Sequence, residues 1–237
     1  MGSKPLSAVP PRLRWALATA LALQLLWHFS GTAPLARARA LAPAPARATL
    51  LLASLGEPLA LSKAMMLYLQ GEDDQAGVNL AWNTLDYPRI AAWLDAILAL
   101  DPRGQYPLLA ASEVYGAVND AARVRFMLDF VAARFAQDPD RRWPWLAHAA
   151  LVAKHRLHDL PLARRYAQAI RQQATGPGVP AWARELEVFI LEDMNELDSA
   201  KTLIGGLISG GQISDPHELA FLSQRLEQIA ARQAGGP

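Results

Sequence analysis

The sequence predicts an all-α protein: an α-solenoid of about four helix pairs with a C-terminal capping helix, preceded by one N-terminal transmembrane or signal helix. Three observations lead to this prediction. An amphipathic pattern recurs four times, an apolar segment lies near the N-terminus, and no stretch alternates apolar and polar residues as strands do. The 237 residues are enough to bury a substantial core, and the lack of Cys excludes disulfides, thiolate metal sites and cysteine nucleophiles.

The first 50 residues divide into three parts by composition. Residues 1–14 are a basic segment, 15–30 are predicted to be a signal anchor or transmembrane helix, and 31–50 are an Ala/Pro-rich linker. A basic segment followed by an apolar one is typical of chains handed to the export machinery. The apolar stretch 15–29 rises only about 22 Å as a helix, less than the roughly 30 Å hydrocarbon core, so a full span needs its flanks. A cleaved signal peptide and a buried core helix are the alternatives.

The basic residues around the apolar segment bear on its orientation. Three precede it and three follow it, so the positive-inside comparison is tied. Arg12 and Arg14 adjoin the segment, whereas Arg37 and Arg39 lie eight or more residues beyond it. This favours a single-pass protein of a bacterial inner membrane with its body in the periplasm. Secretion to the periplasm after cleavage, with Ala38 and Ala40 at the cleavage site, is the alternative.

A helical-repeat domain is predicted over residues 51–233. In its pattern, an acidic residue is followed by apolar residues at offsets of 4, 7, 8 and 11, which lie on one stripe of an α-helix. The acid at the start suits the positive end of the helix dipole. The four starts are 34, 39 and 37 residues apart, and we expect each to open the second helix of a pair. They are Asp86, Asp120, Asp159 and Glu196.

The first helices of the pairs are predicted from proline positions and apolar spacing. They lie at 59–69, and at about 106–117, 143–156 and 180–193, where the last three have Pro in the first turn. Residues 215–218 resemble a capping box that opens a last helix. The predicted apolar face of that helix consists of Leu219, Leu222, Leu226 and Ile229.

The chain resembles the tetratricopeptide repeat family (TPR-like) over about residues 80–231. The resemblance rests on the second-helix pattern, on Ala163 and Ala200 at the small position four after the acid, and on the ending Leu100-Asp101-Pro102. The first helices lack the Trp, Leu-Gly and Tyr spacing of the family, and the interhelix segment 71–86 is long, so Sel1-like and other helical-pair solenoids stay open. The resemblance implies binding of a protein or peptide on the concave face and no chemistry.

No residue pattern predicts catalysis, a cofactor or a metal site. Glu72-Asp73-Asp74 lacks the spacing and the glycine of a calcium loop, and 205–211 contains no nucleophile elbow and no phosphate-loop lysine. His148, His155 and His158 have no cysteine to complete a metal site, and paired carboxylates such as Glu185 and Glu187 are predicted on helix surfaces. We therefore predict no enzymatic activity, no cofactor and no small-molecule substrate. An enzyme acting on a periplasmic polymer is the third interpretation.

The charge of the body predicts where a partner binds. Residues 51–133 contain 5 basic and 10 acidic residues, 134–171 contain 8 and 3, and 172–237 contain 4 and 9. A basic middle between acidic ends favours a protein or peptide partner with an anionic segment; nucleic acid is not expected because no reading motif is present. The candidate partner-binding residues are Arg141, Arg142, Trp145, His148, Val152, Lys154, His155 and Arg156.

Together these features predict a membrane-anchored extracytoplasmic scaffold or adaptor that mediates protein–protein interactions in an envelope complex. The alternative is a permanent, non-catalytic structural subunit of a membrane enzyme or transport complex.

Overall fold

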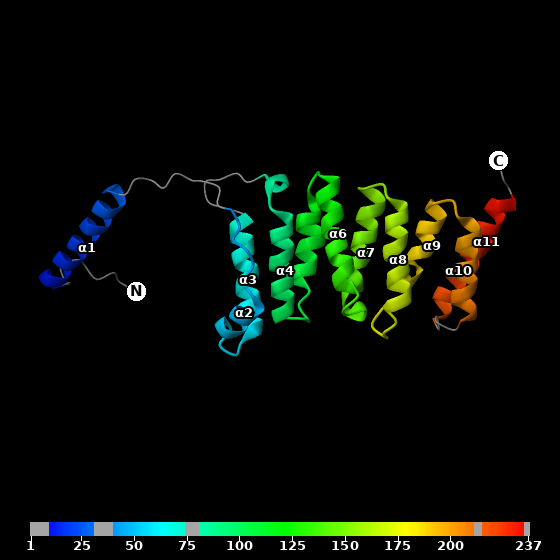
Figure 1. Ribbon diagram of the computed structural model, residues 1–237, viewed down its shortest axis with the longest axis horizontal. Helices are drawn as coiled ribbons and strands as arrows, with labels where there is room; N and C mark the ends of the chain where they lie inside the picture. The colour runs from blue at the N-terminus through cyan, green and yellow to red at the C-terminus, as the bar shows by residue number, and fades with distance from the viewer. Residues whose placement is uncertain (1–9, 31–39, 74–80, 211–214, 235–237) are drawn as a thin grey trace, which may run out of the picture. The chain divides into compact units, whose positions relative to one another are not determined.

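A computed structural model of the chain describes residues 10–30, 40–73, 81–210 and 215–234 (Figure 1). These residues divide into two units, one that contains α1 (Pro11–Ser30) and a helical body that contains the described residues from 40 onward. Helices are the only regular secondary structure in the described ranges, which confirms the all-α class. The predictions made for residues 1–9 and 31–39 and for Asp74 lie outside the described residues.

Helix α1 has an apolar surface all round after its two arginines. Its described side chains, up to Trp27, are exposed. Among the described residues, no single helix has both the length and the hydropathy of a membrane span. Helices α2 (Arg47–Ala53) and α3 (Pro58–Asp73) reach both only when they are taken together, and they are bent by 111° relative to each other.

The helices of the body pack in chain order. Each contacts the next, and α4 also contacts α6, α5 contacts α7 and α7 contacts α9, so helices of successive pairs lie side by side (Figure 1). This packing is consistent with a helical repeat. After α2 and α3 come η2 (Trp82–Thr84), α4 (Tyr87–Leu100), α5 (Tyr106–Leu109), η3 (Ala110–Val114), η4 (Tyr115–Ala117), α6 (Ala121–Phe135), α7 (Pro139–His155), α8 (Leu160–Gln173), α9 (Ala181–Asp193), α10 (Leu197–Ser209) and α11 (Pro216–Ala234).

The predicted starts of the second helices are confirmed. The four acidic residues are the N-caps of α4, α6, α8 and α10. The Asp86 carboxylate accepts from the backbone N–H of Arg89 at 3.1 Å, and the Asp159 carboxylate accepts from that of Leu162 at 2.9 Å. An N-cap carboxylate satisfies a backbone donor that the helix itself cannot pair, so the three aspartates fix where their helices begin, whereas the Glu196 side chain makes no such hydrogen bond.

Two first helices differ from their predictions. The segment 106–117 is not one helix: α5 passes into the π turn η3 and then into η4. This irregular backbone buries Tyr115, whose hydroxyl donates to Asp73 and whose carbonyl accepts from the Tyr87 hydroxyl at 3.2 Å. Helix α7 begins at Pro139 rather than at 143, because a proline at the first helical position lacks only a donor that would be unpaired there.

The predicted linker 31–50 also differs from the structure at its C-terminal end. Residues 40–46 are extended and packed on the body, and α2 begins at Arg47. The carbonyl of Leu41 accepts from Arg89 Nη1 at 2.6 Å, and that of Ala42 accepts from Trp93 Nε1 at 2.8 Å. These donors lie about 50 residues away in the chain, so local composition gives no sign of them.

The core of the body consists of two clusters that meet at α9. Ala183 and Ile190 belong to a cluster that runs from α2 to α9, whereas Val188 and Leu191 belong to one shared with α10 and α11. The apolar face predicted for the last helix is confirmed, since its residues pack in this second cluster. Helix α9 is therefore buried on two sides, which leaves it only a narrow polar stripe.

Candidate binding groove

The eight residues predicted to bind a partner all lie on α7 or at its C-cap, Arg156. The structure does not present them as one surface. Arg142 and Val152 are only 3% and 7% exposed, so they face the interior. The basic pattern of the sequence does not distinguish a buried arginine such as Arg142 from an exposed one.

Arg142 joins the end of α6 to the segment that follows α4. Its Nη1 donates to the carbonyl of Arg134 at 2.6 Å and to Gln137 Oε1 at 3.1 Å, and its Nη2 donates to the carbonyl of Pro102 at 3.0 Å. Burial lowers the pKa of the Arg142 guanidinium. The side chain is thus used by the fold and is not available to a partner.

Three further candidates join α7 to its neighbours. Arg156 Nη2 donates to the carbonyls of Val118 at 2.8 Å and Ala117 at 3.1 Å, and so holds the segment before α6. Trp145 Nε1 donates to Gln105 Oε1 at 2.6 Å, in the preceding pair. Lys154 forms an ion pair with Asp193 in the following pair.

The last three candidates are more accessible. Arg141 is exposed, with its Nε 2.8 Å from Asp138 Oδ2; His155 is exposed and His148 is half-buried. Trp143, which the sequence places next to the candidates, contacts the ring of Trp182 edge-on at 5.1 Å, whereas Trp145 points to the preceding pair. The eight predicted residues therefore contribute mainly to contacts between helix pairs.

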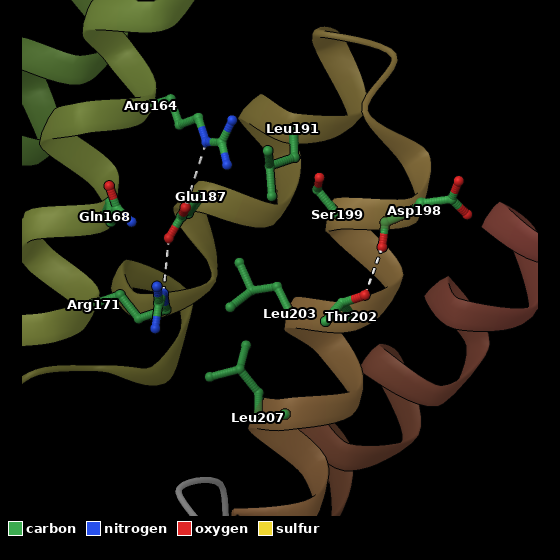
Figure 2. Close-up of a pocket in the computed structure, with 11 residues that line it drawn as sticks. Arg164, Gln168, Arg171, Glu187, Leu191, Asp198, Ser199, Thr202, Leu203 and Leu207 are labelled. Atoms are coloured by element: carbon green, nitrogen blue, oxygen red, sulfur yellow. Dashed lines mark hydrogen bonds and ion pairs between the residues drawn. The ribbon is translucent and has the colours of Figure 1, made fainter.

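A different surface has the geometry of a binding site. An open groove of about 600 Å³ runs between α8, α9 and α10 (Figure 2). One wall comes from α8, the floor from α9 and the other wall from α10. The lining residues are Arg164, Gln168 and Arg171 on α8, Glu187 and Leu191 on α9, and Asp198, Ser199, Thr202, Leu203, Gly206 and Leu207 on α10.

The α8 wall is polar because of its spacing. Arg164, Gln168 and Arg171 are separated by four and then three residues, so they lie on one stripe of the helix. The opposite stripe, with Leu162 and Tyr166, is buried in the core. Arg164 and Arg171 belong to the basic segment 134–171, but they lie on a second helix, whereas the first helices were expected to carry the site.

Glu187 is the centre of the polar part. Its side chain is 3% exposed, its Oε2 lies 2.8 Å from Arg171 Nε, and its Oε1 lies 3.7 Å from Arg164 Nε (Figure 2). A buried carboxylate needs such partners, since an unpaired one would be costly. Glu185 is equally buried, and burial raises the pKa of its carboxyl. The prediction that Glu185 and Glu187 lie on a helix surface is wrong, because α9 is covered on two sides.

The α10 wall is apolar at one end. Leu203 and Leu207 point from α10 into the groove (Figure 2). Gly206 lies between them in sequence, and a Cβ built there meets no atom within 4 Å, so this position leaves free space. The combination of guanidinium groups, hydroxyls and leucines can bind a ligand with both polar and apolar groups.

The groove has no arrangement that resembles a catalytic one. Its lining contains hydroxyl groups but no histidine or lysine to activate them, and its one buried carboxylate is held by two arginines. Among the residues that the structure describes, no three His, Asp or Glu side chains lie close enough to hold a metal ion.

Comparisons of the chain with protein-family models, with curated proteins and with solved structures give no match.

Proposed function

We propose that this protein is a membrane-anchored scaffold or adaptor whose tetratricopeptide-like α-solenoid binds a segment of a partner protein. The recurring helix pairs and their packing in chain order support the solenoid. The observation that carries the binding function is the groove between α8, α9 and α10. A groove between repeated helices is a usual place for an extended peptide.

The groove favours a partner segment that carries both a carboxylate and an apolar side chain. A guanidinium has five N–H donors, more than Arg164 and Arg171 use in their contacts with Glu187 and Glu196, so both can also hold a carboxylate of the partner. Leu203 and Leu207 offer an apolar surface beside them. No enzymatic activity is proposed, because the lining offers no nucleophile with a base.

The proposed location follows from the N-terminal segment. The exposed apolar side chains of α1 suit a bilayer better than water, and Arg12 and Arg14 adjoin their cytoplasmic end. The body then lies in the periplasm of a bacterium, attached to the inner membrane. Secretion after cleavage would give the same body without the anchor.

Two adjacent glycines on α10 allow a matched test. Gly206 lines the groove and Gly205 does not, while a Cβ at either position meets no atom within 4 Å. Gly206→Arg should fill the groove without disturbing the fold, and Gly205→Arg should leave it open. Both should keep the helix, since Arg has a higher helix propensity than Gly.

The experiment isolates each full-length variant from its own membranes in mild detergent and identifies the companion proteins. Companions that are lost with Gly206→Arg and kept with Gly205→Arg support an adaptor that uses the groove. The same comparison with displayed random peptides gives a second readout. One companion retained in equal amount by both variants, even at high salt, would contradict groove binding and indicate the alternative, a permanent structural subunit.

A further inference from the structure

The first two helices of the body, α2 and α3, and the turn between them expose a group of leucines, which we call the apolar edge. The described helices that follow expose no such group. Leu52 is 80% exposed, Leu55 is 91% exposed, and Leu67 is 70% exposed. The opposite faces of α2 and α3 are packed in the core by Leu50, Met65, Met66 and Leu69. The edge therefore belongs to a firmly held hairpin and not to a frayed terminus.

The edge continues along α3. Leu59, Lys63 and Leu67 are four residues apart, so they lie on one stripe, and all three are exposed. Between Arg47 and Gly71 the charged residues are Arg47, Glu57 and Lys63. The surface is thus apolar, with Lys63 within its α3 stripe, Arg47 at the start of α2 and Glu57 in the turn.

The turn between α2 and α3 places a leucine in a conformation that suits glycine. Leu55 has φ +49° and precedes Gly56 with φ +89°. The left-handed region is unfavourable for a non-glycine residue, because its Cβ comes too close to the following carbonyl oxygen. Because Leu55 is 91% exposed, no packing within the described residues offsets this cost. Leu55 is thus an exposed apolar side chain at a strained position of the turn.

The hydropathy of α2 and α3 points to a bilayer as the surface that contacts them. Together α2 and α3 have the hydropathy of a membrane span, but the bend of 111° prevents them from forming a straight one. A bent apolar hairpin with basic flanks suits the interfacial layer.

We propose that the α2–α3 turn inserts Leu51, Leu52 and Leu55 into the interfacial layer of the membrane that holds α1, with Arg47 and Lys63 against anionic lipid headgroups. The inference rests on the proposed membrane tether. It adds a second contact, which fixes the body against the bilayer instead of leaving it to rotate on its linker.

The lack of cysteine makes a direct test possible, since a single introduced Cys can be labelled alone. Full-length protein carrying Leu52→Cys or Leu55→Cys is labelled with a nitroxide and reconstituted into vesicles of phosphatidylethanolamine and phosphatidylglycerol. Leu151→Cys on α7, where the native side chain is 43% exposed, is the matched control in the body, and Leu21→Cys reports on α1. Collision rates with oxygen and with a water-soluble nickel complex are then measured by electron paramagnetic resonance.

The proposal expects collision with nickel at positions 52 and 55 to be at least about fivefold lower than at 151, with oxygen collision retained, because an interfacial side chain lies roughly 5–10 Å below the headgroups. Equal nickel access at 52, 55 and 151, with position 21 shielded, would overturn the inference and leave the tether intact. Nickel access at position 21 would overturn the tether itself. Shielding of position 52 from both reagents, with spin–spin broadening that grows with protein density, would show that a second copy covers the edge.

Discussion

Arg164 Nη1 lies 2.9 Å from Oε2 of Glu196, and this ion pair joins the second helices of two successive pairs. Arg164 is the fifth residue after the N-cap Asp159, and Glu196 is the next N-cap. Arg125 is likewise the fifth residue after Asp120 and pairs with Asp159. The residue at the same offset after Glu196, Lys201, bonds Gln233 on α11 at 3.0 Å. The same position thus links α6 to α8, α8 to α10 and α10 to α11, whereas the fifth residue after Asp86 is Ala91 and forms no such link.

This link predicts a small, acid-sensitive contribution to stability. The hydrogen bond from Arg125 lowers the pKa of Asp159, so the contribution is present above the unfolded value of 3.8 and is lost as the pH falls through the lower folded value. Arg125→Gln should reduce the free energy of unfolding by about 0.5 kcal/mol at pH 7, because the pair is partly exposed. Urea unfolding at pH 7 and at pH 3 measures it, and an equal loss at both would argue against the ion pair.

Arg142 and Arg141 are adjacent in sequence, but replacing Arg142 should destabilise the protein much more than replacing Arg141. Arg142→Ala should lower the free energy of unfolding by roughly 3 kcal/mol, since it leaves the carbonyls of Arg134 and Pro102 without their donor. Arg141→Ala should change it by less than about 0.5 kcal/mol, because its pair with Asp138 is exposed. Thermal or urea unfolding of both variants measures the two losses in the free energy of unfolding. Similar losses for the two would mean that the buried guanidinium does not act as described.

Because of Asp73, the free energy of unfolding should fall as the pH rises from 3.8 to about 6. Burial raises the pKa of its carboxyl from 3.8 to about 6, so the folded state holds the proton more tightly between these values. Asp73→Asn keeps an acceptor for Tyr115 and removes the titration. At pH 7 it should be more stable than the native protein by roughly 1 kcal/mol after allowance for solvent screening, and the difference should vanish near pH 4.

The Tyr115 hydroxyl gives a control for this assignment. Its hydrogen bond lowers the pKa of Asp73 against the effect of burial, so Tyr115→Phe should move the pH dependence to higher pH. A variant whose unfolding profile keeps the native pH midpoint would show that another group titrates. The profile is followed by urea unfolding between pH 4 and 8.

Replacing Leu55 with a residue that tolerates its backbone conformation should make the protein more stable. Asn tolerates the left-handed region better than Leu, so Leu55→Asn should raise the free energy of unfolding of the detergent-solubilised protein by about 0.5–1 kcal/mol. The matched change Leu52→Asn on α2, where the backbone is helical, should give no such gain. Equal effects of the two changes would mean that the backbone at Leu55 carries no strain.

Much of the helix architecture could be predicted from local patterns. An acid followed by apolar residues on one stripe is both a cap and a core face, so Asp86, Asp120, Asp159 and Glu196 were placed at the correct helix starts. Pro107 and Pro216 likewise lie in the first turns of the helices predicted for them. These features depend on residues within one or two turns, and the sequence displays them directly.

The candidate site depended on contacts that no local pattern records. Arg142 and Arg164 are both basic residues of one charged segment, yet the first bonds carbonyls inside the body and the second lines an open groove. Glu187 was expected at a surface and is buried, because α9 lies between two core clusters. The sequence by itself determined where the helices begin and which stripe of each is apolar. Which polar residues face the solvent was decided by the tertiary structure, since burial of a charge depends on partners that lie 16 to 40 residues away.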